Sequence, residues 1–160
     1  MNLFLKKLVD ENKIKLTDPS DDICNAYLKK SENSMVSSKT LRDIGNYDDA
    51  VALTYYSMYY SALALLYACG IKSENHTGTI ILLKEIIKLD HLPLEEAKKE
   101  RVDKQYYIDF NVAREDVNQG ITSAESFIQE MRLNIDRLSN GLKQEYREKL
   151  KEYIGKKEDE

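Results

Sequence analysis

The chain is poor in residues that interrupt helices and in residues that build metal or redox sites. Its 160 residues include only six glycines and two prolines, which fall mostly between segments of helical hydrophobic spacing. The two cysteines and two histidines lack the clustered spacing of a zinc site or a CxxC motif. We therefore expect free thiols in a reducing compartment, and no metal or other cofactor.

The chain also lacks a strong charge of one sign and a long apolar run. Its net charge of −4 argues against broad, sequence-independent binding to nucleic acid, but is compatible with a local basic cleft. No apolar run reaches the roughly 18 residues of a membrane span. The first residues, MNLFLKKLVDENKIKL, have neither the apolar core nor the cleavage site of a secretion signal. We therefore expect a cytoplasmic protein with no membrane segment.

Helical periodicity runs through most of the sequence and predicts an all-α, antiparallel up-and-down bundle of about five helices. We expect one domain over residues 1–160, with a core at about 18–140 and a helical or frayed C-terminal tail at 141–160. A short amphipathic piece over about 2–14 precedes the bundle. The five helices are expected over about 18–44, 46–69, 78–89, 94–119 and 122–139.

Caps and breakers set these expected boundaries. Asp18 and Asn46 are predicted N-caps, because short polar side chains satisfy the free amides of a first turn. Gly70 and Gly120 are predicted terminators, since glycine adopts the left-handed conformation that ends many helices. The segment TSAE at 122–125 fits a capping box for the last bundle helix.

The stretch TYYSMYYSALALLYACGI, residues 54–71, contains five tyrosines and no charge. A helix with no charged side is expected to be buried all round, either as the central helix of the bundle or under a second subunit. One of its sides carries only small residues, which allow close approach of a neighbouring helix: Thr54, Ser57, Ser61, Ala64 and Ala68. The tyrosines are either packing material, or Tyr55 or Tyr56 faces a polar pocket.

The same stretch carries a family resemblance. AVALTYYSMYYSALALLYACGIKSENHTGTIILL resembles the signature of the HEPN family, and of a small prokaryotic group within it, through its paired tyrosines, Gly70, His76 and Gly78. Downstream, YYIDFNVAREDVNQGITSAESFIQEM is similar to a looser second motif of that group. Its matching points are Asp109, Phe110, Ala124 and Phe127, while Gln105 replaces the group's arginine.

The resemblance implies an antiparallel bundle of about five helices that forms a homodimer. It also implies a small nucleotidyltransferase protein as partner, in a toxin–antitoxin arrangement. Many family members are metal-independent ribonucleases, with an arginine followed after about four to six residues by a histidine that transfers a proton. In this sequence the positions that follow Arg114 at that spacing are Gln119, Gly120 and Ile121, none of which is a histidine.

This departure favours a dimeric binding module for nucleotide or RNA over an enzyme. The alternative is a ribonuclease toxin with a variant active site, for which His76 and Arg114 are the candidate catalytic residues. The candidate ligand-binding residues are Tyr55, Tyr56, His76, Arg114 and Asn118.

Structural roles remain open for several of these residues. His76 either contacts a phosphate beside the amides of Thr77 to Thr79 or packs its loop against a neighbouring helix. Arg114 either forms a structural ion pair or contacts a phosphate. The acidic and basic residues between 95 and 104 fit a solvated helix face.

Overall fold

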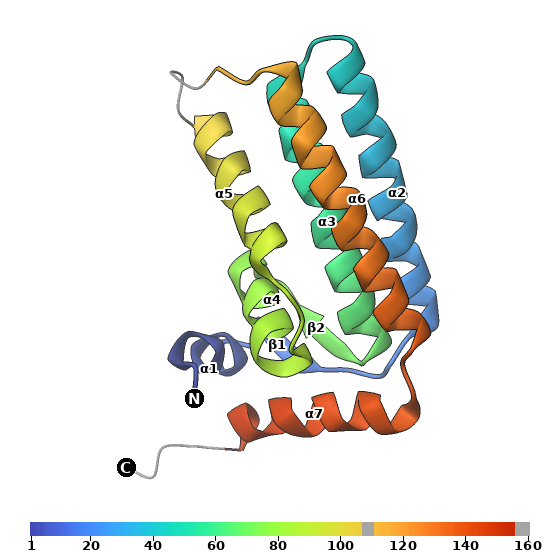
Figure 1. Ribbon diagram of the computed structural model, residues 1–160. Helices are drawn as coiled ribbons and strands as arrows, with labels where there is room; N and C mark the ends of the chain where they lie inside the picture. The colour runs from blue at the N-terminus through green and yellow to red at the C-terminus, as the bar shows by residue number, and fades with distance from the viewer. Residues whose placement is uncertain (107–110, 156–160) are drawn as a thin grey trace.

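Four helices lie side by side and form the bundle, while the shorter elements gather at one end of it (Figure 1). The computed structural model describes residues 1–106 and 111–155. The bundle helices are α2 (Asp21–Asp43), α3 (Tyr47–Ala68), α5 (Leu92–Tyr106) and α6 (Arg114–Asp136). The other elements are α1 (Leu3–Asp10), β1 (Ile14–Leu16), β2 (Ile71–Ser73), α4 (His76–Leu82), the π-helical segment η1 (Leu83–Ile87) and α7 (Asn140–Ile154). The prediction of an all-α helical fold is confirmed.

A two-stranded antiparallel sheet is the one addition to the helical prediction within the described residues. Ile14 pairs with Ser73, and Leu16 pairs with Ile71. Both isoleucines are buried. Three-residue strands are too short to show the alternation that identifies a strand in sequence. Residues 71–73 were therefore left in the connection between the helices expected over 46–69 and 78–89.

Helix α3, which carries no charge after Asp49, lies at the centre of the bundle. Every residue from Ser61 to Ile71 is buried within a single chain. Helices α2, α5 and α6 pack around α3. A second copy of the chain is therefore not required to cover this helix.

A seam of small hydroxyl side chains joins α2 to α3. Ser38 Oγ lies 2.6 Å from the Thr54 hydroxyl and donates to the carbonyl of Ala50 at 2.8 Å. Ser31 Oγ donates to the Ser57 carbonyl at 2.6 Å. These serines interrupt the apolar stripe of α2 and face the small side of α3. A buried hydroxyl with a partner contributes on the order of 1 kcal/mol, whereas one without a partner is costly.

Several predicted helix boundaries are wrong. The segment expected as one helix over 94–119 contains the end of α5 at Tyr106 and the start of α6 at Arg114. Ser20, not Asp18, caps α2, because the Ser20 hydroxyl accepts a hydrogen bond from the Ile23 amide at 3.1 Å. Gly120 does not end a helix, since α6 runs through it to Asp136 and Thr122 lies inside α6. Glycine in a helix interior costs only about 1 kcal/mol relative to alanine, and packing offsets it. Here Gly120 lies against Thr54 of α3.

Helix α7 closes the end of the bundle where the sheet lies (Figure 1). The Arg147 guanidinium donates to the carbonyls of Thr17 at 2.6 Å and Gly70 at 2.8 Å. Gly70 has a φ of +73°, and a Cβ there would lie 2.5 Å from the Thr17 carbonyl oxygen. Gly70 thus ends α3 as predicted, and α7 is held at that turn.

Both cysteines are free and buried, which confirms the prediction of free thiols. Burial raises the pKa of the Cys69 thiol to about 12, so this thiol stays protonated and unreactive near neutral pH. No helix among the described residues is long and apolar enough to cross a membrane.

We expect Ala64→Leu to lower the free energy of unfolding by about 1–3 kcal/mol, because Ala64 is fully buried and packs beside Cys24 and Ala68. Urea unfolding followed by circular dichroism measures this change. Ala26→Leu, at an exposed position of α2, is the matched control and is expected to leave stability nearly unchanged. Equal stability of the two variants would contradict close packing of Ala64 against α2.

Candidate functional site: a tyrosine–histidine cluster

Four aromatic side chains from α3 and α4 meet in one place, which we call the tyrosine–histidine cluster: Tyr55, Tyr56, Tyr59 and His76. The Tyr55 hydroxyl and His76 Nδ1 share a hydrogen bond of 2.6 Å. The His76 ring stacks on Tyr59 with centroids 4.1 Å apart and an interplanar angle of 7°. Tyr56 meets His76 edge-on at 6.2 Å. The structure thus brings three predicted site residues together, and adds Tyr59.

Local structure holds His76 at the start of α4. Asn75 caps this helix, since its side-chain oxygen accepts from the Gly78 amide at 2.8 Å, and the Thr79 amide donates to the Asn75 carbonyl at 2.9 Å. Two of the three amides that were expected to contact a phosphate, those of Gly78 and Thr79, are therefore already hydrogen-bonded. Gly78 allows α4 to lie close to Leu8, because a Cβ there would come within 2.6 Å of that side chain.

Arg101 of α5 brings positive charge to the cluster. Its guanidinium carbon lies 5.0 Å from the Tyr56 ring centroid and 5.3 Å from that of Tyr55. Sequence reasoning missed Arg101, because the charged run from 95 to 104 was interpreted as a solvated face. The available signal was a single arginine among lysines, since the flat guanidinium stacks on aromatic rings more readily than an ammonium does.

Burial shifts the pKa of three groups in the cluster toward their neutral forms. Burial, together with Arg101 and Lys98, lowers the pKa of His76 below its ordinary value of 6.5. Burial raises the pKa of Tyr55 and of Tyr59. A neutral imidazole and a protonated phenol share their bond most simply with the Tyr55 hydroxyl donating to Nδ1, which leaves a proton on Nε2.

The other two predicted site residues, Arg114 and Asn118, lie near the C-terminal end of α2. Arg114 Nη2 forms an ion pair with Asp43 at 3.3 Å, and the Arg114 side chain is 53% exposed. The Asn118 side-chain oxygen accepts from Arg42 Nη1 at 3.3 Å. Arg114 begins α6 at the opposite end of the bundle from α7 (Figure 1). Within one chain, neither residue is part of the tyrosine–histidine cluster. Asp109 and Phe110 lie outside the described residues.

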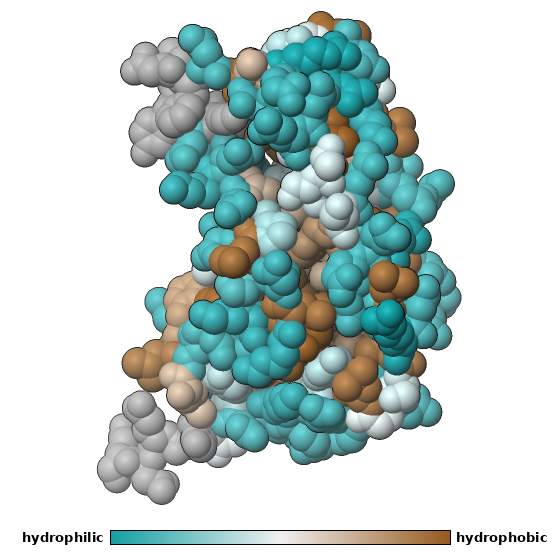
Figure 2. All heavy atoms as spheres, in the orientation of Figure 1, coloured by the Kyte–Doolittle hydropathy of each residue, from teal (hydrophilic) through white to brown (hydrophobic). Residues whose placement is uncertain are grey.

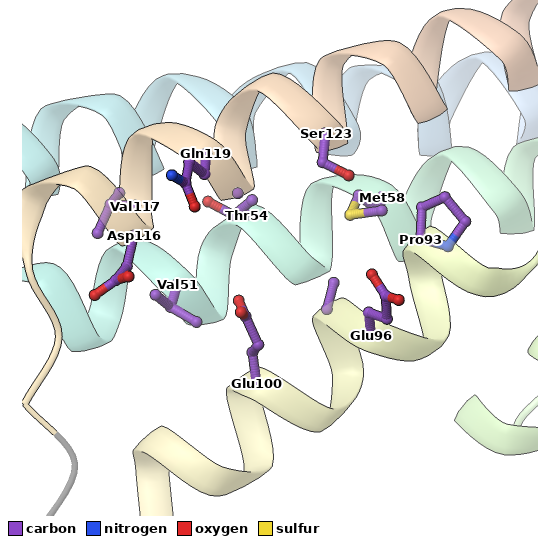
Figure 3. A pocket seen from close by; sticks show the side chains of 12 residues that line it. Val51, Thr54, Met58, Pro93, Glu96, Glu100, Asp116, Val117, Gln119 and Ser123 are labelled. Carbon is purple, nitrogen blue, oxygen red and sulfur yellow. The ribbon is translucent and has the colours of Figure 1, made fainter.

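A cavity of about 190 Å³ lies between α3, α5 and α6, and we call it the acidic pocket. Figure 3 shows Glu96 and Glu100 of α5 pointing toward α3 and α6, with Asp116 on the facing helix. Val51 and Met58 supply apolar surface. In Figure 2, apolar atoms lie in the depression between α5 and α6, with hydrophilic residues around it. Three carboxylates make this pocket unfavourable for a phosphate group.

Comparisons with known proteins point to one family. A model of the HEPN domain matches residues 24–135, which include α3 to α5, most of α2 and nearly all of α6. "Putative toxin MJ0142" from Methanocaldococcus jannaschii is 38% identical over 69 residues, which cover 42% of this chain and 47% of that protein. "UPF0332 protein glr0978" from Gloeobacter violaceus is 33% identical over 69 residues, or 42% of this chain and 55% of that protein.

A further relative aligns over more of the chain. "Putative toxin MJ0605", also from Methanocaldococcus jannaschii, is 27% identical over 119 residues, which cover 74% of this chain and 88% of that protein. The matches to the first two relatives extend over only about half of their length.

We expect His76 to titrate with a pKa below 6.5, because protonation adds a buried charge beside Arg101 and Lys98. Between the pKa of His76 in the folded chain and 6.5, its ordinary value, the unfolded chain binds more protons than the folded one. The free energy of unfolding therefore falls as the pH drops through that range. Nuclear magnetic resonance of the two histidines measures the pKa, with His91→Gln to assign the signals. Arg101→Gln is expected to raise the pKa of His76.

Lys39→Gln removes the same charge on α2, where Lys39 pairs with Glu125, and serves as the control. A His76 pKa at or above 6.5 in the unaltered protein, or one that does not respond to Arg101→Gln, would contradict the described electrostatics.

Proposed function

Because this chain belongs to the HEPN domain family, we propose that it is a homodimeric binding module and one half of a toxin–antitoxin type pair. In this proposal its partner is a small nucleotidyltransferase, and its ligand is a nucleotide or RNA. The names of the two Methanocaldococcus jannaschii relatives support a toxin-like role. The tyrosine–histidine cluster is the proposed ligand site, together with Arg101.

The observation that carries the proposal is the combination of rings and cation in this cluster. Tyr56 is half-buried, so part of its ring is open to a ligand. Arg101 lies over that ring at 5.0 Å, and Lys98 is close enough to lower the pKa of His76. Aromatic faces bind bases by stacking, and guanidinium and ammonium groups bind phosphate. This is the local basic site that the net charge of −4 left open.

The residue at the position of the expected histidine argues against a ribonuclease of the usual family type. Gln119 occupies that place after Arg114, and an amide side chain does not act as a general acid or base. Gln119 also lines the acidic pocket, near Glu100 and Asp116 (Figure 3). Carboxylates there repel the phosphate that the arginine would have to hold.

One geometric observation favours a second candidate, a ribonuclease with a variant site. His76, kept neutral near pH 7, is hydrogen-bonded to Tyr55 and lies beside Arg101. To accept a proton from a ribose hydroxyl, this imidazole needs the opposite tautomer, with Nδ1 donating to the Tyr55 oxygen and Nε2 unprotonated, and an arginine then stabilises charge on the phosphate. In this variant arrangement Arg101 replaces Arg114, which the sequence had indicated as the partner of His76.

We expect the purified protein to bind a fluorescein-labelled oligouridine RNA and to leave it intact, because no histidine follows Arg114 at the family spacing. Fluorescence anisotropy measures binding, and denaturing gel electrophoresis measures cleavage. Arg101→Gln is expected to weaken binding at least fivefold, since an aromatic-stacked cation contributes about 1 kcal/mol or more. Lys39→Gln is the matched charge control.

Cleavage that is lost in His76→Gln would establish the variant ribonuclease instead. Cleavage that is lost only in Arg114→Ala would point to the usual family site. Absence of any RNA binding in the unaltered protein would overturn RNA as the ligand.

We expect sedimentation equilibrium to give twice the 18.5 kDa chain mass, because an apolar face stays open on α2 and α6. Met35, Val36 and Ile128 line a groove there, and Val36 is 65% exposed. Val36→Glu is expected to shift the protein toward monomer, because it places a charge in an apolar contact. Val102→Glu, at an exposed valine of α5, is the control. A monomer at all concentrations would contradict the dimer.

A further inference from the structure

Three half-buried tyrosines continue the tyrosine–histidine cluster along the surface toward α2. The Tyr56 and Tyr60 rings of α3 stack at 5.9 Å with an interplanar angle of 27°. Tyr60 then stacks with Tyr27 of α2 at 6.0 Å and 28°. We call Tyr56, Tyr60 and Tyr27 the tyrosine track. The three rings follow one another in nearly parallel planes and are each partly open to solvent.

A cation lies on the rings at each end of the tyrosine track. At the α2 end, Lys30 Nζ is 5.4 Å from the Tyr60 centroid and 5.7 Å from that of Tyr27. At the other end, Arg101 lies over Tyr56. Lys30 is exposed, so its long side chain can leave the ring face and keep its charge near a ligand. The track therefore combines three aromatic rings with a positive charge at each end.

This composition fits a single-stranded nucleic acid better than a protein partner. Unpaired bases stack on successive aromatic rings, and the backbone phosphates between them attract lysine and arginine. A protein interface favours aliphatic surface, and the groove that Met35, Val36 and Ile128 line together with Glu32, Glu125 and Arg132 offers more of it than the track does. None of the three tyrosines of the track lines the acidic pocket.

We propose that the tyrosine track binds single-stranded RNA by base stacking, with Lys30 and Arg101 contacting phosphates at its two ends. The inference rests on the proposed function and narrows it, since it makes the ligand a strand of several nucleotides rather than a single nucleotide. Bases from successive nucleotides lie over Tyr27, Tyr60 and Tyr56, and the strand then reaches His76.

The test compares binding of a fluorescein-labelled, about 12-nucleotide oligouridine to the unaltered protein and to track variants, by anisotropy over a range of salt concentrations. Tyr60→Leu keeps an apolar side chain but removes the ring. It is expected to weaken binding at least about fivefold, the lower bound for loss of one stacked base. Tyr60→Phe keeps the ring and is expected to bind at least fivefold more tightly than Tyr60→Leu.

Lys30→Gln tests the phosphate contact without touching the core. It is expected to weaken binding and to reduce the slope of log affinity against log salt by about 0.7, the value for one phosphate contact on a single strand. Lys149→Gln is the matched control, because Lys149 lies 5.6 Å from the Tyr146 ring on α7, outside the track. Thermal unfolding checks that each variant is folded, and Lys30→Gln decides the outcome if Tyr60→Leu does not fold.

The outcomes separate this inference from the proposed function. If Arg101→Gln loses RNA binding while Lys30→Gln and Tyr60→Leu bind as the unaltered protein does, the track is wrong and the ligand site at the cluster stands. If the unaltered protein binds no oligouridine, both fail. If the track variants dissociate a homodimer and leave RNA binding unchanged, the surface is a protein interface and the inference is overturned.

Discussion

The rest of the structure depends on one constraint, the burial of a helix that has no charge beyond its first turn but many hydroxyls. Between Val51 and Ile71 no side chain is charged, so α3 is stable only when other elements surround it. Burial of its apolar side chains supplies much of the stabilisation, at about 1.5–3 kcal/mol for each large one. Each buried hydroxyl must in turn find a partner, because an unpaired one costs about 1–3 kcal/mol.

The hydroxyls of α3 find partners in two different ways. On the side facing α2, serine and threonine bond to each other and to backbone carbonyls, as Ser38 does with Thr54. On the side facing α4, Tyr55 bonds to His76. The first solution is a packing seam between two helices. The second places a histidine, a ring stack and Arg101 next to partly exposed surface, and this is where function is proposed.

The position of the family's histidine and the tyrosine–histidine cluster differ in the charges that surround them. Gln119, at the place of the expected histidine, opens to a pocket with Glu96, Glu100 and Asp116. Arg114 is held by Asp43 at the end of α2. Positive charge gathers instead around His76, from Arg101 and Lys98. A chain with this distribution attracts phosphate at the α3–α4–α5 junction and repels it at the α3–α5–α6 pocket.

The sequence by itself determined the helical class, the burial of α3, the turn at Gly70 and the missing histidine after Arg114. These follow from local periodicity, local backbone conformation or residue identity, all of which can be read without a fold. Only the tertiary structure decided that Arg101 joins Tyr56 and His76, that Arg114 turns to Asp43, and that α6 passes through Gly120. Residues far apart in the sequence meet only when helices pack at specific rotations and offsets, and a single sequence does not specify either quantity.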